Sequence, residues 1–129
     1  MSTEYKPDGY NSVSPYLVVD GAAATIEFLK QAFDAVELRR YAGEAGKIMH
    51  AEVRIDDTVV MLADGVPPEW PALLAHVHVY VSDVDAAYAR ALEAGAVSIQ
   101  APEKKEDADK RGGVQDAGGT TWWIATKVE

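Results

Sequence analysis

Apolar and polar residues follow the same order twice along this chain. Residues 14–40 read SPYLVVDGAAATIEFLKQAFDAVELRR, and residues 76–101 read HVHVYVSDVDAAYARALEAGAVSIQA. In each stretch a β-branched run ends in aspartate, an Ala-rich segment with helical spacing follows, and Ala-Val opens a second strand. Asp20 and Asp83 mark equivalent points, 63 residues apart (83 − 20). A unit of this size cannot bury its own apolar face, so the two copies are expected to pack into one structure.

The first copy is predicted to contain one helix and four strands. The strands are expected at 13–19, 36–41, 48–55 and 58–63, and the helix at 22–34. Asp20 precedes the helix and is expected to cap it. In the strand 48–55 the odd-numbered residues, from Met49 to Ile55, should face one way and the even-numbered residues the other.

The second copy repeats this order after a linker at 65–74, which is rigid because it holds three prolines. A strand at 75–81 alternates valines with His76, His78 and Tyr80. Ser82 and Asp85 resemble a capping box for the next helix, which Gly95 ends. A strand at 97–100 precedes a charged segment, EKKEDADKRGG, which is predicted to be a mobile loop. A hairpin that turns at 118–119 completes the copy.

The order βαβββ, found twice, predicts an α+β fold in which the two repeats form a cup-like mixed sheet with helices on the outside. The expected domain is a single one over 1–129, with repeat one at about 12–64 and repeat two at 75–128.

Four segments carry a resemblance to a known family: PYLVVDGAAATIEF at 15–28, IMHAEVRIDDTVVMLAD at 48–64, HVHVYVSDVDAAYARALEAGA at 76–96, and DAGGTTWWIAT at 116–126. The chain resembles the vicinal oxygen chelate superfamily, which includes glyoxalase I, bleomycin resistance proteins and extradiol dioxygenases, and within it the PhnB-like branch. The resemblance implies a cup that holds a metal or a small molecule, often completed by two chains together. A homodimer is therefore expected.

The resemblance also implies where a divalent metal would bind, through four groups on the strands of the two copies. Carried over position by position, these groups fall on Val13 or Ser14, Met61, His76 and Trp123. Divalent metals prefer imidazole or carboxylate ligands, and among these residues only His76 supplies one. No metal cofactor is therefore expected at the ordinary site.

Four polar residues are expected on the strand faces that line or approach the cup: His50, Glu52, His76 and His78. His76 and His78 lie two apart on one strand, so they point the same way and can clasp one metal or one anionic group. His50 or Glu52 from a neighbouring strand would complete a non-standard metal site or an acid–base pair. The alternative is a set of polar residues on a half-solvated sheet, hydrogen-bonded to one another.

The aromatic residues suggest a ligand-binding surface. Trp122 and Trp123 are successive on a strand, so one should enter the core and the other the cup, and the resemblance places Trp123 in the cup. An indole there would stack on a planar compound or a cation. Met61 and Tyr80 are expected to line the same cavity. The alternative is that Trp122 and Trp123 both serve only in packing. Trp70, in the linker, is expected to be a lid or a dimer contact.

The composition of the chain restricts the classes of partner that it can bind. The chain has 129 residues, a net charge of −9 and no cysteine. This charge disfavours nucleic acid and anionic membranes and favours a cationic small molecule. No disulfide or thiolate site is possible, and a cytoplasmic location is expected.

Three functions remain open from the residues. The first is a metal-independent small-molecule binding protein of the glyoxalase/bleomycin resistance type that sequesters a planar or cationic compound. The second is a lyase or isomerase with an atypical site built from the His and Glu residues. The third is a structural dimer with a filled cup.

Overall fold

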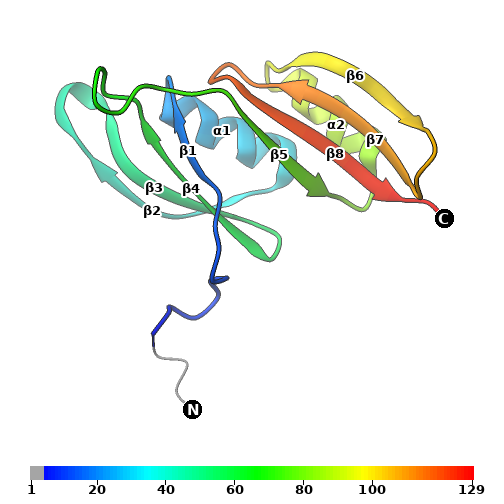
Figure 1. Ribbon diagram of the computed structural model, residues 1–129, viewed down its shortest axis with the longest axis horizontal. Coiled ribbons are helices and arrows are strands. Elements are labelled where there is room, and N and C mark those ends of the chain that lie inside the picture. The colour runs from blue at the N-terminus through cyan, green and yellow to red at the C-terminus, as the bar shows by residue number, and fades with distance from the viewer. Residues whose placement is uncertain (1–4) are drawn as a thin grey trace.

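The computed structural model describes residues 5–129 and shows two four-stranded sheets, each covered by one helix (Figure 1). The first module contains β1 (Tyr16–Val19), α1 (Ala22–Phe33), β2 (Val36–Ala42), the 3-10 turn η1 (Glu44–Gly46), β3 (Ile48–Ile55) and β4 (Thr58–Asp64). The second contains β5 (Ala75–Tyr80), α2 (Val84–Glu93), β6 (Val97–Lys104), β7 (Asp109–Gln115) and β8 (Thr120–Lys127). The predicted α+β class with two βαβββ repeats is confirmed.

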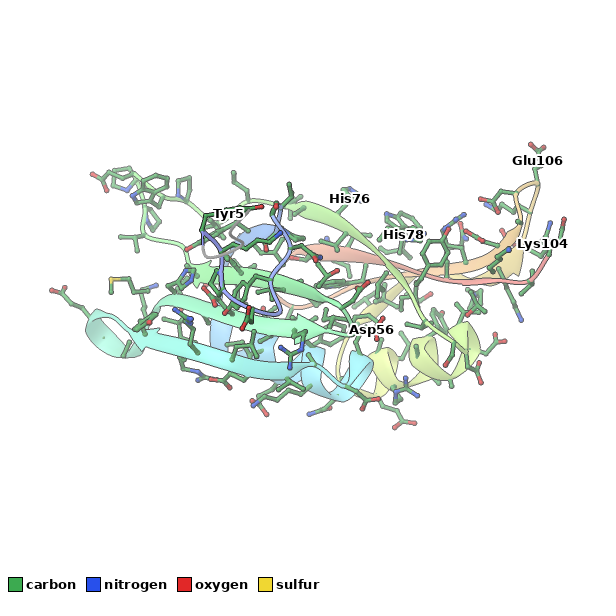
Figure 2. All side chains as sticks on the ribbon, turned by 90° about the horizontal axis from the view of Figure 1, so that it is seen from below. Tyr5, Asp56, His76, His78, Lys104 and Glu106 are labelled. Carbon is green, nitrogen blue, oxygen red and sulfur yellow. The ribbon has the colours of Figure 1, made fainter. Side chains whose placement is uncertain are left out.

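The two modules share one topology. The strand orders are β1-β4-β3-β2 and β5-β8-β7-β6. The pairs β1–β4 and β5–β8 are parallel, and the other neighbouring pairs are antiparallel. The helices α1 and α2 pack against each other on one side of the molecule. Each sheet therefore has an open face, the side away from its helix, and the labelled His76 and His78 extend from that side (Figure 2).

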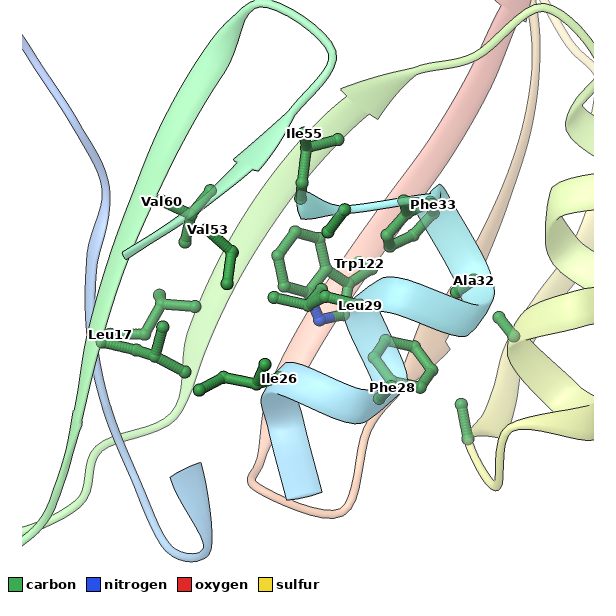
Figure 3. Close-up of a cluster of buried hydrophobic side chains, with 14 of the residues drawn as sticks. Leu17, Ile26, Phe28, Leu29, Ala32, Phe33, Val53, Ile55, Val60 and Trp122 are labelled. Atoms are coloured by element: carbon green, nitrogen blue, oxygen red, sulfur yellow. The ribbon is translucent and has the colours of Figure 1, made fainter. Parts of the chain in front are cut away.

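The two modules share one hydrophobic core, in which Trp122 is the largest fully buried side chain. Trp122, on β8, is fully buried beside α1, and its ring centroid lies 5.4 Å from that of Phe33 (Figure 3). Ile26 and Leu29 of α1 are also fully buried. Successive residues of a strand face opposite sides, so burial of Trp122 puts Trp123 on the open face. The prediction that one of the two tryptophans enters the core is confirmed.

Both predicted helix caps are wrong. Asp20 does not cap α1; Gly21 occupies the N-cap position, and Asp64 from the end of β4 accepts hydrogen bonds from the Gly21 and Ala22 N–H groups at 3.0 and 2.8 Å. At α2 the cap is Asp83, whose side chain accepts from the Ala86 N–H at 3.1 Å, in place of Ser82. A cap supplied from a distant strand leaves no local sequence signal, which explains the error at α1.

Asp64 is expected to make stability depend on pH. Its carboxylate also accepts from the Ile48 N–H at 2.8 Å. Burial opposes ionisation, but the three backbone hydrogen bonds outweigh it and hold the pKa of Asp64 below its usual value. The resulting stability is present above the unfolded-state pKa and is lost as pH falls through the lower folded-state pKa.

Asp64→Asn should therefore lower the free energy of unfolding by about 1–2 kcal/mol at neutral pH, because one amide oxygen cannot accept all three bonds. The difference from the wild type should shrink in acid. Urea titrations at neutral and acidic pH measure the free energy of unfolding. Asp20→Asn is the matched control and should leave this free energy unchanged at both pH values. If the free energies of unfolding of the wild type and Asp64→Asn differed by the same amount at both pH values, the assigned role of the Asp64 carboxylate would be contradicted.

Two further strand predictions need correction. At the start of β3, Ile48 is buried and Met49 is 64 % exposed, the reverse of the predicted alternation. A β-bulge pairs Tyr41 with His50 and Ala42 with Ile48 and leaves Met49 as the extra residue. The charged segment 103–113 is mostly strand, since β6 continues to Lys104 and β7 begins at Asp109. The side chains of this outer hairpin are mostly charged and exposed, so the sequence lacks the alternation of apolar and polar residues that predicts strands.

No helix in residues 5–129 is long and apolar enough to cross a membrane.

Candidate functional site

On the open face of the first module, polar side chains gather around Glu52 of β3. Glu52 is only 5 % exposed and accepts hydrogen bonds from the Tyr10 hydroxyl and from His50 Nε2 at 2.8 Å, and Arg39 Nε lies 3.2 Å from its carboxylate. Burial opposes ionisation, but the bonds from Tyr10 and His50 and the charge of Arg39 hold the pKa of Glu52 below its usual value. Glu52 is therefore an ionised carboxylate with both oxygens engaged.

The hydrogen bonds around His50 define its tautomer. An ionised carboxylate can only accept, so the Nε2 atom that faces Glu52 carries a proton. In neutral His50 the Nδ1 atom is then an acceptor, and the Tyr16 hydroxyl lies 2.9 Å from it. The rings of Tyr16 and Tyr41 flank the imidazole at centroid distances of 5.5 and 6.1 Å. Glu52, His50 and Tyr16 thus form one hydrogen-bonded chain that ends at a phenol.

On the open face of the second module, Trp123 and His76 form a flat aromatic surface. Their ring planes are 7° apart with centroids 6.2 Å apart, and Trp123 Nε1 donates to His76 Nδ1 at 3.0 Å. The parallel pairing of β5 with β8 brings the two residues together. We call this pair the aromatic platform.

The platform depends on Gly113 of β7, which faces Trp123 across the ladder. A Cβ atom at this position would lie 2.6 Å from Trp123 Cζ3, closer than side chains tolerate. Glycine therefore lets the indole lie flat over the neighbouring strand. Sequence reasoning missed this residue, although a glycine inside a strand is itself a sign of close approach by another group.

Beside the platform, His78 and Tyr80 belong to a charged network centred on Arg111. Arg111 Nε donates to His78 Nε2 at 3.1 Å, and its other nitrogens contact Asp107 and Asp109 at 3.0 and 2.8 Å. Burial and the Arg111 charge lower the pKa of His78, so its imidazole is neutral near pH 7. The hydrogen bond from Tyr80 to Asp109, 2.7 Å long, and burial raise the pKa of Tyr80.

The structure brings the predicted site residues together in pairs within one chain. His50 contacts Glu52, His76 contacts Trp123, and the rings of His78 and Tyr80 are 4.8 Å apart. Met61 of β4 is the cross-strand partner of Glu52, and it lines a hollow of the first module together with Tyr10, Ser12 and Ser14. Sequence reasoning also missed Tyr16, which precedes an ordinary apolar run and is marked only by its contact with His50.

The metal positions implied by the fold do not fit a divalent ion. Met61 offers a thioether, and the indole N–H of Trp123 is already donated to His76. His76 and His78 each bond to a different partner. Over residues 5–129, no three His, Asp or Glu side chains cluster in a way that would hold a metal.

Comparisons with known proteins identify relatives over nearly the whole chain. Residues 9–124 match the model of the Glyoxalase/Bleomycin resistance protein/Dioxygenase superfamily. The chain is 42 % identical over 127 residues to an uncharacterised protein of Mycobacterium bovis, covering 91 % of this chain and 84 % of that protein. An uncharacterised protein of Mycobacterium tuberculosis is also 42 % identical over 127 residues, with 91 % and 75 % covered.

Two solved structures share the fold. TioX from Micromonospora sp. ML1 matches with a TM-score of 0.69 and 23 % identity, covering 90 % of this chain and 99 % of that one. TnmS3 from Streptomyces sp. CB03234, described as an antibiotic binding protein, matches with a TM-score of 0.68 and 21 % identity, covering 91 % and 98 %. At these identities the likeness concerns the fold alone.

Proposed function

This chain belongs to the Glyoxalase/Bleomycin resistance protein/Dioxygenase superfamily, and from that premise we propose that it binds a planar or cationic small molecule without a metal and sequesters it. The observation that carries the proposal is the aromatic platform of Trp123 and His76, which lies flat on Gly113. A planar ligand gains contact area there, and a cation is attracted to the indole face. The fold shared with the antibiotic binding protein TnmS3 supports a binding role.

Charge favours a cation over an anion. The chain carries a net charge of −9, and the Arg111 that bonds to His78, the cross-strand neighbour of Trp123, is paired with both Asp107 and Asp109. The long-range field of such a protein raises the local concentration of cations and repels anions. His78, Tyr80, Met61, His50 and Glu52 complete the proposed set of ligand-binding residues. A cytoplasmic location is part of the same proposal and rests on the absence of cysteine.

Trp123→Ala should weaken binding of a planar cation, for which N-methylacridinium is the probe, by about 10-fold or more, because aromatic stacking contributes about 1–3 kcal/mol. Quenching of tryptophan fluorescence measures binding. Gly113→Ala should weaken it as well, because the added methyl lifts the indole from β7 while Trp123 remains. Gly43→Ala is the matched control, since its Cβ would meet neighbours only at 3.5 Å.

Unchanged affinity in both Trp123→Ala and Gly113→Ala would contradict the proposal. Absence of binding by the wild type, with quenching no greater than for free tryptophan, would favour the structural dimer with a filled cup.

We also propose that two chains pair through their open faces, so that the first module of one covers the second module of the other. Exposed aromatic residues on these faces support this arrangement: Tyr16 is 51 % exposed and Tyr80 is 61 % exposed. Light scattering should give twice the chain mass of 13.9 kDa. A mass of one chain at micromolar concentration would contradict the pairing.

A second candidate function is that of a lyase or isomerase with acid–base chemistry. The contact of 2.8 Å between His50 and the ionised Glu52 favours it, because a carboxylate that orients an imidazole is a common arrangement for a general base.

A further inference from the structure

We propose that Glu52, His50 and Tyr16 form a proton relay that catalyses reversible enolisation of a neutral, planar ketone bound in the pocket beneath Trp70. The site lies on the first module. It shares His50 and Glu52 with the proposed ligand-binding set but does not include Trp123, on which cation binding is tested. The proposal extends the second candidate function, that of a lyase or isomerase. It names Tyr16 as the residue that exchanges a proton with the substrate, and it names the substrate class.

The relay is built around a fixed carboxylate. Glu52 is buried, ionised and held from the other side by Tyr10 and Arg39, so it stays in place to orient His50. The distances along the chain are 2.8 Å from Glu52 to His50 and 2.9 Å from His50 to Tyr16. Each step is within the range required for proton transfer. The carboxylate stabilises the imidazolium that forms when His50 takes a proton.

The phenol at the end of the relay lines an apolar pocket of about 410 Å³. The other apolar residues of its wall are Val18, Met49, Ala63, Val66 and Trp70. The bulge in β3 supplies Met49 to this wall, and hydrogen bonds of 2.6 and 2.9 Å between the backbones of Val66 and Trp70 fold the linker over it. A pocket of this size and lining suits a planar bicyclic molecule.

The charges at the pocket favour a neutral substrate. The one charged residue in its lining is Asp64, whose carboxylate accepts three backbone hydrogen bonds. The nearby guanidinium of Arg39 is paired with Glu52. An anionic substrate therefore finds no free cation among the described residues of this wall.

The proposed step balances within the protein and the substrate. The C–H bond next to the carbonyl breaks, its electron pair moves to the carbonyl oxygen as an enolate, and the proton joins the Tyr16 oxygen. The phenol proton passes to His50 Nδ1, which gives an imidazolium facing Glu52. Return of the protons to the same or another carbon completes an exchange or an isomerisation, and no oxidant, reductant or co-reactant is consumed.

The test uses 2-indanone, a neutral planar ketone with acidic methylene hydrogens, in D₂O near neutral pH. Proton NMR follows the loss of the methylene signal, corrected for exchange in buffer. The wild-type chain should accelerate exchange, and Tyr16→Phe and His50→Gln should each lower the protein-dependent rate by about 100-fold. Tyr88→Phe, which removes a hydroxyl on α2 far from this pocket, should leave the rate unchanged and is the matched control.

Three results would overturn the relay: no acceleration by the wild type, an unchanged rate in Tyr16→Phe, or an equal loss in Tyr88→Phe. Circular dichroism of each variant separates loss of the relay from loss of the fold. Because exchange is read on 2-indanone and cation binding on tryptophan fluorescence, either proposal can fail while the other holds.

Discussion

Trp122→Ala is expected to lower the free energy of unfolding by about 3–5 kcal/mol, a large part of the stability of an ordinary domain. Trp122 is fully buried and is the largest side chain in the core. It comes from the second module but packs on Phe33 of the first, so its removal leaves a cavity where the modules meet. The loss also leaves the Asp116 carboxylate without the indole N–H that it holds at 2.8 Å.

Urea denaturation measures the effect, and Trp123→Ala is the matched control from the next position of the same strand. Trp123 is partly exposed on the open face, so the cost of its removal should be clearly smaller. Equal losses for the two variants would mean that the core does not join the modules through Trp122.

Asp116→Ala is expected to lower the free energy of unfolding by about 3 kcal/mol, because buried donors lose a charged acceptor. Asp116 is buried between β7 and β8 and accepts from the N–H groups of Gly118 and Thr120 at 3.0 and 3.1 Å, as well as from Trp122. Asp116→Asn keeps one acceptor oxygen and should cost less. The same urea titration gives both values.

Coupling between Asp116 and Trp122 provides a sharper check of this assignment. In a Trp122→Phe background the indole N–H is already gone, so Asp116→Ala should cost less than in the wild type. Strictly additive losses in this double-mutant cycle would contradict a direct role for the hydrogen bond between the two side chains.

Local periodicity was enough to predict the two βαβββ units and the opposite orientations of Trp122 and Trp123. It failed where a distant residue decides the local structure. Asp64 caps α1 from another strand, and the bulge at Met49 arises from pairing with β2. The strand at the start of β7 was mistaken for a loop because its side chains are charged.

The candidate site was only partly predictable for the same reason. Sequence places His50 and Glu52 on one face of one strand, so their contact follows from the spacing of two residues. The contact of His76 with Trp123 depends on the register of two strands far apart in the chain, which periodicity does not give. Tyr16 and Gly113 acquire their roles only from cross-strand neighbours.

The central claim, that a planar cation stacks on the aromatic platform, is tested most directly by fluorine NMR of the chain labelled with 5-fluorotryptophan. Trp70, Trp122 and Trp123 should give separate resonances, assigned by single substitutions. On titration with N-methylacridinium, the Trp123 resonance should shift strongly while that of the buried Trp122 stays nearly constant. A titration that leaves the Trp123 resonance in place, or that moves only Trp70, would contradict the proposed site.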